Sequence, residues 1–213
     1  MIITPRISLF NDFLSHEEWS VINSYCKENN NFFEKINRGT SVKWKPDRHS
    51  ADPDFKFNRS FLISREQHDE SKDYGDLFDV SIDFLKDGDV SNMLKNMLDK
   101  IQVHIEKIEN KKLLRESGPW LTRMSTGDSM SMHCDGTFIH NKDHTSEYSI
   151  IYYINDDYDG GEFNMPKMGF KLKPKANSLL LFTNSFNENM AHEVMTVTSG
   201  NRYVSQSWYA TVL

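Results

Sequence analysis

After Pro119 the sequence consists of short β-rich segments separated by turn residues, and this pattern constrains the fold more than any other feature. The clearest segments are EYSIIYYIND at residues 147–156 and SLLLFT at residues 178–183. Their apolar runs are continuous rather than alternating, which indicates strands that are covered on both faces. Many short strands with turn signals between them are typical of a sandwich, a barrel or a jelly roll.

Two amphipathic helices are predicted before this β-rich part. The first follows Ser15, which can cap a helix together with Glu18 three residues later, and it continues with apolar residues at helical spacing. The second is expected over residues 91–109. Its apolar stripe, which we interpret as core packing, consists of Met93, Met97, Ile101, Ile105 and Ile108.

The region between the two predicted helices is charged and contains Pro46 and Pro53. We interpret it as a polar loop over residues 38–58 and a strand near residues 57–64. No flexible linker separates the helical half from the β-rich half. The sequence therefore predicts one domain of mixed α+β, mainly β, structure.

Composition limits the classes of partner. The net charge of −6 disfavours a nucleic-acid partner, because surfaces that bind phosphate backbones are usually basic. Cys26 and Cys134 form no CxxC pattern, so we expect no disulfide scaffold and a reducing cytoplasm. The first residues lack the pattern of a signal peptide, and no apolar run approaches the ~20 residues that span a bilayer. We expect no membrane partner.

The motif HCD at residues 133–135 places three possible metal ligands in a row. Side chains alternate between the two faces of a strand, so His133 and Asp135 point the same way and Cys134 points the other way. An extended strand would therefore let the histidine and the carboxylate share one ion without the thiol.

A third ligand has to come from elsewhere in the chain. Of the eight histidines, His192 is the best candidate, because it opens the β-rich segment HEVMTVTSGNRYVSQSW. Two histidines and one carboxylate form the facial triad of non-haem Fe(II) oxygenases. A structural zinc site would instead close four protein ligands around the ion.

Arg202 follows His192 by ten residues, and TSGN between them is a turn signal. A three-residue hairpin loop at 199–201 would place Thr198 opposite Arg202 and His192 opposite Trp208, with His192 and Arg202 facing one interior. A buried guanidinium needs a counter-charge. That partner is either the carboxylate of a ligand whose other end reaches the metal, or a carboxylate of the protein.

The motif HCD followed by HEVMTVTSGNRYVSQSW resembles the Fe(II)/2-oxoglutarate-dependent dioxygenases, in particular their prolyl and lysyl hydroxylase (prolyl 4-hydroxylase-like) branch. The segments SIIYYINDDYDGGEF, RISLFNDFLSHEEWSVI and NRSFLIS look like further parts of that family's domain. The resemblance implies a double-stranded β-helix, or jelly roll, as a single domain over 1–213. Residues 1–117 would give mostly helical support and a substrate loop, and residues 118–213 the jelly-roll core.

The same resemblance implies roles for individual residues. It implies that His133, Asp135 and His192 bind Fe(II), and that Arg202 pairs with the distal carboxylate of 2-oxoglutarate. It also implies that Tyr153 supports this carboxylate, for which the alternative is plain core packing, and that Phe163 lines the pocket. Catalysis would use O₂ and 2-oxoglutarate, release succinate and CO₂ and hydroxylate a C–H bond, with ascorbate as an optional reductant.

One departure from the family pattern concerns two methionines. The family often has tyrosines three and nine residues before the first ligand histidine, where this chain has Met130 and Met124. We expect either a co-substrate pocket with fewer hydrogen bonds on that side or a substitute group. Arg123, beside Met124, is a candidate for that substitute.

The closest resemblance predicts hydroxylation of prolyl residues in a peptide or protein, with residues 38–58 as the source of substrate contacts. The same chemistry on a free amino acid or another small metabolite is the alternative. Nucleic-acid demethylases of the superfamily usually have a second arginine where this chain has Trp208. A metal-binding jelly roll without oxygenase activity, or a zinc hydrolase, would have no need of Arg202. We expect a monomer or a weak dimer.

Overall fold

The computed structural model of the chain describes residues 2–4, 7–30, 33–37, 58–62, 88–133, 135, 144–183 and 190–212. Two expectations therefore lie outside the described residues. One is the orientation of Cys134, and the other is the expected substrate-contacting role of the polar segment up to residue 57.

The largest element is an antiparallel sheet of eight strands in the order β1-β2-β11-β7-β14-β5-β4-β3. Its strands are β1 (Ile2–Thr4), β2 (Ile7–Phe10), β11 (Ser178–Thr183), β7 (His144–Tyr153), β14 (Asn201–Val212), β5 (Leu113–Ser125), β4 (Asn58–Leu62) and β3 (Phe33–Asn37). Four of these strands come from the first 62 residues, so the N-terminal half adds strands as well as helices. Strand β5 runs without a break across the boundary that we expected between residues 117 and 118.

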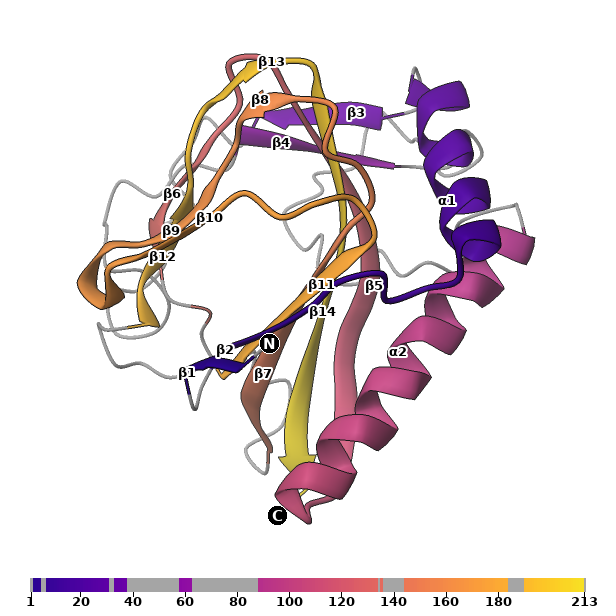
Figure 1. Cartoon of the computed structure of the whole chain (residues 1–213), viewed down its shortest axis with the longest axis vertical. Coiled ribbons are helices and arrows are strands. Elements are labelled where there is room, and N and C mark those ends of the chain that lie inside the picture. The colour runs from indigo at the N-terminus through magenta and orange to yellow at the C-terminus, as the bar shows by residue number, and fades with distance from the viewer. Residues whose placement is uncertain are drawn as a thin grey trace.

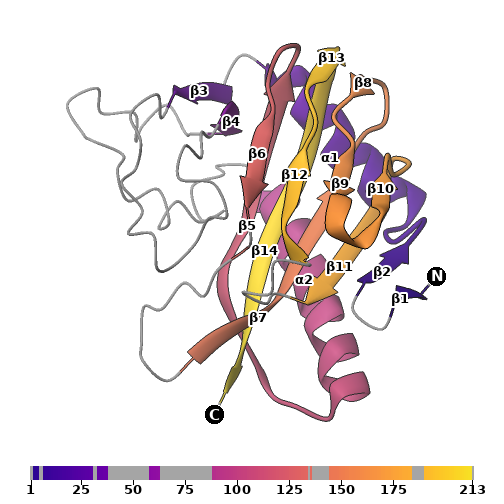
Figure 2. The same cartoon turned by 90° about the vertical axis from the view of Figure 1, so that its left-hand side faces the viewer.

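A smaller antiparallel sheet covers one face of the large one (Figure 2). It consists of β10 (Phe170–Leu172), β9 (Phe163–Met165), β12 (His192–Val194) and β6 (Met130–His133), in that order. A short 3₁₀ turn, η4 (Pro166–Met168), joins β9 to β10, and β8 (Asp159–Gly160) pairs with β13 (Val197–Ser199). These facing sheets are those of a double-stranded β-helix, so the predicted fold class is confirmed.

Two helices cover the opposite face of the large sheet, α1 (His16–Glu28) and α2 (Gly88–Glu109) (Figure 1). The predicted capping box is present, because Ser15 accepts from the Glu18 amide and Glu18 accepts from the Ser15 amide. The α2 stripe is confirmed at Met97, Ile101 and Ile105, which are buried. The prediction that Ile108 belongs to this buried stripe is wrong, because Ile108 is 66% exposed. Burial on this face of α2 therefore ends at Ile105. No helix in the described part of the chain is long and apolar enough to cross a membrane.

The double burial of the central strands is confirmed on β7, where residues 148–153 are all buried. Tyr148, Ile150 and Tyr152 belong to the core under the helices, whereas Ile151 and Tyr153 belong to the core between the sheets. Strand alternation thus divides one continuous apolar run between two cores. The inner core between the two sheets is the space that holds the candidate site.

The hairpin predicted at residues 199–201 is wrong. Strand β13 pairs with β8, while β14 pairs with β5 and β7, so Arg202 lies opposite Met124 rather than Thr198. The turn carries the chain from one layer of the jelly roll to the other. Gly200 has φ 79°, and a Cβ there would lie 3.0 Å from the carbonyl oxygen of Asp157. Glycine thus permits both the left-handed conformation and the close approach.

Candidate metal centre and carboxylate pocket

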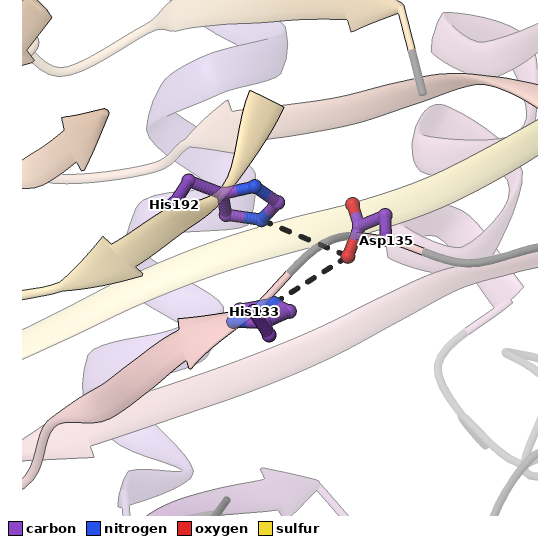
Figure 3. A group of neighbouring side chains, drawn as sticks. All are labelled: His133, Asp135 and His192. Atoms are coloured by element: carbon purple, nitrogen blue, oxygen red, sulfur yellow. Dashed lines mark ion pairs between the residues drawn. The ribbon is translucent and has the colours of Figure 1, made fainter. Parts of the chain in front are cut away.

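Three polar side chains meet at the end of the inner core. His133 is the last residue of β6, Asp135 follows two residues later, and His192 is the first residue of β12. Strands β6 and β12 pair with His192 directly opposite His133. Asp135 Oδ1 lies 3.5 Å from His133 Nε2 and 3.7 Å from His192 Nε2 (Figure 3). The three ligand atoms all lie within 4.8 Å of one another.

The second oxygen of Asp135 is held from the large sheet. Ser149 on β7 donates its hydroxyl to Asp135 Oδ2, and Trp208 Nε1 on β14 donates to the same oxygen at 3.2 Å. Ser149 and Trp208 lie opposite each other in the register of these two strands. With Oδ2 occupied in this way, Oδ1 remains directed at the two histidines. The sequence reasoning did not identify Ser149, although its inward parity on β7 is the signal that could have.

The imidazole of His192 is oriented by its other ring nitrogen. His192 Nδ1 lies 3.0 Å from the carbonyl oxygen of Met190, which can only accept, so Nδ1 carries the proton and Nε2 presents a lone pair. The rings of Phe163 and Phe182 pack against the same imidazole, each at 5.1 Å between centroids. Phe163 therefore lies beside the metal-facing histidine, as a wall of the inner core.

The charge states suit a cation. Burial raises the pKa of Asp135, but His192 and His133 beside it outweigh burial and hold that pKa well below its usual range. Burial and, to a smaller extent, the charge of His133 lower the pKa of His192 to about 4, although Asp135 opposes them. Near neutral pH the carboxylate is therefore charged and the His192 imidazole is neutral. Within the described ranges no fourth histidine, cysteine or carboxylate joins the cluster, which fits a three-ligand catalytic site rather than a closed zinc site.

Arg202 lies in the same inner core and is only 1% exposed. Its Nη1 donates to the Met124 sulfur at 3.5 Å, while Nε and Nη2 have no hydrogen-bond partner among the described residues. The guanidinium carbon lies 5.0 Å from the ring centroid of Tyr153, whose buried hydroxyl also has no partner in the described ranges. Among the described residues no carboxylate pairs with Arg202. A buried cation in this state fits an anionic ligand, because such a charge is costly without a counter-charge.

The methionines at the two expected tyrosine positions belong to a small apolar cluster, and Met124 contacts Arg202. Met124 and Met130 pack with Val194 and Val197. The suggestion that Arg123 replaces a tyrosine is wrong, because Arg123 donates from Nη1 to the Asn30 carbonyl at 2.5 Å. As the strand neighbour of Met124 it points to the helical side of the sheet, an outcome that the alternation of side chains already required.

Comparisons with known proteins agree with this geometry. Residues 119–210 match the family model of the 2OG-Fe(II) oxygenase superfamily. Prolyl 3-hydroxylase 2 of Mus musculus is 40% identical over 68 residues, which are 30% of this chain and 9% of that protein. The chain therefore spans only a small part of the curated relatives that it matches.

Two solved structures share the fold over nearly the whole chain. The viral collagen prolyl hydroxylase of Paramecium Bursaria Chlorella virus-1, in its 2OG complex, has a TM-score of 0.61 at 14% identity, covering 97% of each chain. The prolyl hydroxylase of Trichoplax adhaerens with a hypoxia inducible factor peptide fragment has a TM-score of 0.59 at 17% identity, covering 97% of this chain and 84% of that one. The family match places residues 119–210 in the 2OG-Fe(II) oxygenase superfamily, and the fold and the His-x-Asp…His cluster agree with that assignment.

Proposed function

We propose that this oxygenase hydroxylates prolyl residues within a peptide or protein. The observation that carries the oxygenase chemistry is the pairing, in one buried core, of a three-ligand cluster with an arginine that lacks a counter-charge. His133, Asp135 and His192 would hold Fe(II), and Arg202 would hold the distal carboxylate of 2-oxoglutarate. When bound, the iron and the co-substrate supply the O₂-dependent oxidation of a C–H bond.

The residues of the chain position the reactants and exclude water. Ser149 and Trp208 fix which oxygen of Asp135 faces the metal, and the Met190 carbonyl fixes the His192 tautomer. Phe163 and Phe182 pack against the His192 imidazole and keep its surroundings apolar. Tyr153 stands beside Arg202, where its hydroxyl can donate to the carboxylate that Arg202 binds.

The prolyl substrate is supported by the relatives. The curated match is a prolyl 3-hydroxylase, and both solved structures named above are prolyl hydroxylases, one of them with a peptide fragment. The net charge of −6 agrees with a peptide rather than a nucleic acid. We also propose that the protein works in a reducing cytoplasm as a monomer or weak dimer. Ascorbate would serve as an accessory reductant.

The test is a substrate screen with the full chain, Fe(II) and 2-oxoglutarate, scored by succinate release. Matched peptides with proline or alanine at one position separate prolyl hydroxylation from uncoupled turnover. We expect a mass gain of one oxygen on proline, with the 3- or 4-hydroxyproline isomer identified after hydrolysis. Turnover of a free amino acid, with proline peptides at background, would remove the peptidyl substrate and leave the oxygenase chemistry in place.

The expected role of residues 38–58 is tested in the same system. Limited proteolysis should cleave this segment in the protein loaded with Mn(II) and 2-oxoglutarate, and the proline peptide should protect it. The alanine peptide is the matched control. Equal cleavage with both peptides, for a proline peptide that the Fe(II)-loaded chain hydroxylates, would separate this segment from substrate binding.

A further inference from the structure

We propose that Tyr158 is a further co-substrate-binding residue, whose hydroxyl donates to the distal carboxylate of 2-oxoglutarate beside Arg202. The inference rests on the proposed function, and it identifies a group that the sequence pattern did not. A tyrosine from the turn between β7 and β8 would supply a hydroxyl to a pocket that has Met124 and Met130 where the family often has tyrosines.

Packing brings Tyr158 against Arg202. A Cβ added to Gly161 would lie 3.1 Å from Arg202 Cδ and 3.2 Å from Tyr158 Cε2, so the arginine stem and the tyrosine ring border the same small space. Tyr158 is 3% exposed, and its hydroxyl is buried without a hydrogen-bond partner. Burial raises the pKa of Tyr158 and the nearby charge of Arg202 opposes that rise, as expected for a phenol close to the guanidinium.

Two neighbours pack against Tyr158. The Lys173 ammonium lies 5.0 Å from the ring centroid and donates to the Tyr158 carbonyl oxygen. The backbone at Gly200 is also close, because a Cβ there would approach Tyr158 Cβ to 3.2 Å. The turn at Gly200 leads directly into Arg202, so the elements that carry the phenol and the guanidinium pack against each other.

The unpaired polar atoms around Arg202 form a set that matches one carboxylate. Arg202 Nε and Nη2 and the hydroxyls of Tyr153 and Tyr158 are all buried and without partners in the described part of the chain. Each of these four atoms can donate, and a carboxylate can only accept. Since Nη1 is directed at the Met124 sulfur, the Nε–Nη2 edge is the one left for a bidentate contact.

Other buried tyrosines show that this arrangement is specific to the inner core. The hydroxyls of Tyr152, Tyr203 and Tyr209 donate to Asn177 Oδ1, Asn30 Oδ1 and the Leu98 carbonyl, respectively. These three tyrosines pack in the core under the helices. Within the part of the chain that the structure describes, the buried tyrosine hydroxyls without a hydrogen-bond partner are thus those of Tyr153 and Tyr158, beside Arg202.

The test compares Tyr158→Phe with Tyr152→Phe in the full chain loaded with Mn(II) and kept without O₂. Calorimetry gives the Kd of 2-oxoglutarate and of 2-oxovalerate, which keeps the 2-oxo acid but lacks the distal carboxylate. Because a hydrogen bond to a charged group is strong, we expect Tyr158→Phe to weaken 2-oxoglutarate binding about 10-fold or more. Binding of 2-oxovalerate should stay unchanged, and Tyr152→Phe should change neither Kd.

The variant Arg202→Ala, measured in the same way, distinguishes a failure of the Tyr158 role from a failure of the proposed function on which it rests. If Arg202→Ala weakens 2-oxoglutarate binding and Tyr158→Phe does not, the role of Tyr158 is overturned and the proposed site stands. If neither variant changes the Kd, the proposed co-substrate site itself fails. Equal weakening of both ligands by Tyr158→Phe would assign the tyrosine to the fold alone.

Discussion

The two ends of the inner core differ in how their buried polar atoms are satisfied. At the metal end, Asp135 Oδ2 and His192 Nδ1, which face away from the cation, already have partners. At the Arg202 end, guanidinium and phenol atoms are buried without a hydrogen-bond partner among the described residues. The metal end is therefore oriented before a ligand arrives, whereas the Arg202 end, in the function proposed above, would be completed by the carboxylate of 2-oxoglutarate. Variants that act on one end and spare the other test this difference.

The largest effect is expected from removal of a ligand side chain. His133→Ala, Asp135→Ala and His192→Ala should each abolish tight binding of Fe(II) or Mn(II), because three ligands leave no redundancy. Anaerobic metal titration measures this loss. Cys134→Ser is the control, and it should bind metal nearly as the unmodified chain does. Loss of metal by that control as complete as that of His133→Ala would refute the strand-parity argument.

Arg202→Ala should act on the opposite end alone. Loss of one partner of a buried charge pair costs ~2–5 kcal/mol, so the Kd of 2-oxoglutarate should rise about 30- to 5000-fold while metal affinity is kept. Arg123→Ala is a matched control, because this arginine donates to the Asn30 and Phe33 carbonyls on the helical side. An unchanged Kd for 2-oxoglutarate in Arg202→Ala would return the residue to a structural role.

Removal of a group that orients Asp135 should have a smaller effect. Ser149→Ala and Trp208→Phe each delete one donor to Asp135 Oδ2, and the loss of such supporting hydrogen bonds typically lowers metal affinity about 10- to 100-fold. Ser205→Ala is the control, because the buried hydroxyl of Ser205 has no hydrogen-bond partner in the described part of the chain. Equal metal affinity in all three variants would mean that the metal end is not oriented by the large sheet.

The smallest effect concerns acid stability of the metal-free protein. The folded-state pKa of His192 is lowered to about 4, so below about 6.5 the unfolded chain binds a proton that the folded chain does not. The contribution of the neutral His192 to the free energy of unfolding is therefore fully present above pH 6.5 and is lost as the pH falls toward 4.

By pH 5 the free energy of unfolding should have decreased on the order of 1–2 kcal/mol from this group. Urea unfolding at pH 7.5 and pH 5 measures the decrease, and His192→Gln should reduce it. His104→Gln, at an exposed position, should behave as the unmodified chain does. The same pH dependence in His192→Gln would show that another group is responsible.

The sequence predicted features that depend on local periodicity. The doubly buried strands around residues 148–153 and the capping box at Ser15 follow from residue spacing, and the parity of His133 and Asp135 agrees with their meeting in one cluster. Prediction from the sequence failed where the partner of a strand lies far along the chain. The turn at Gly200 looks like a hairpin, yet it joins strands of two different layers.

The position of Tyr158 was also beyond local reasoning. Tyr158 lies in a turn, where no period indicates the direction of its side chain. Its proximity to Arg202 depends on how the Gly200 turn packs against it, which is a tertiary contact. For the same reason the sequence could not tell whether a protein carboxylate pairs with Arg202.

Strand β14 carries Arg202 near its beginning and Trp208, the donor to Asp135, six residues later on the same face. It is paired on both sides, with β5 and β7, so its two ends cannot shift relative to each other without breaking a central part of the sheet. The distance between the anion-binding group and the metal ligand is therefore a property of the sheet rather than of a loop. Such an enzyme should select its 2-oxo diacid by chain length, and oxaloacetate or 2-oxoadipate, one carbon shorter or longer, should span the two ends poorly.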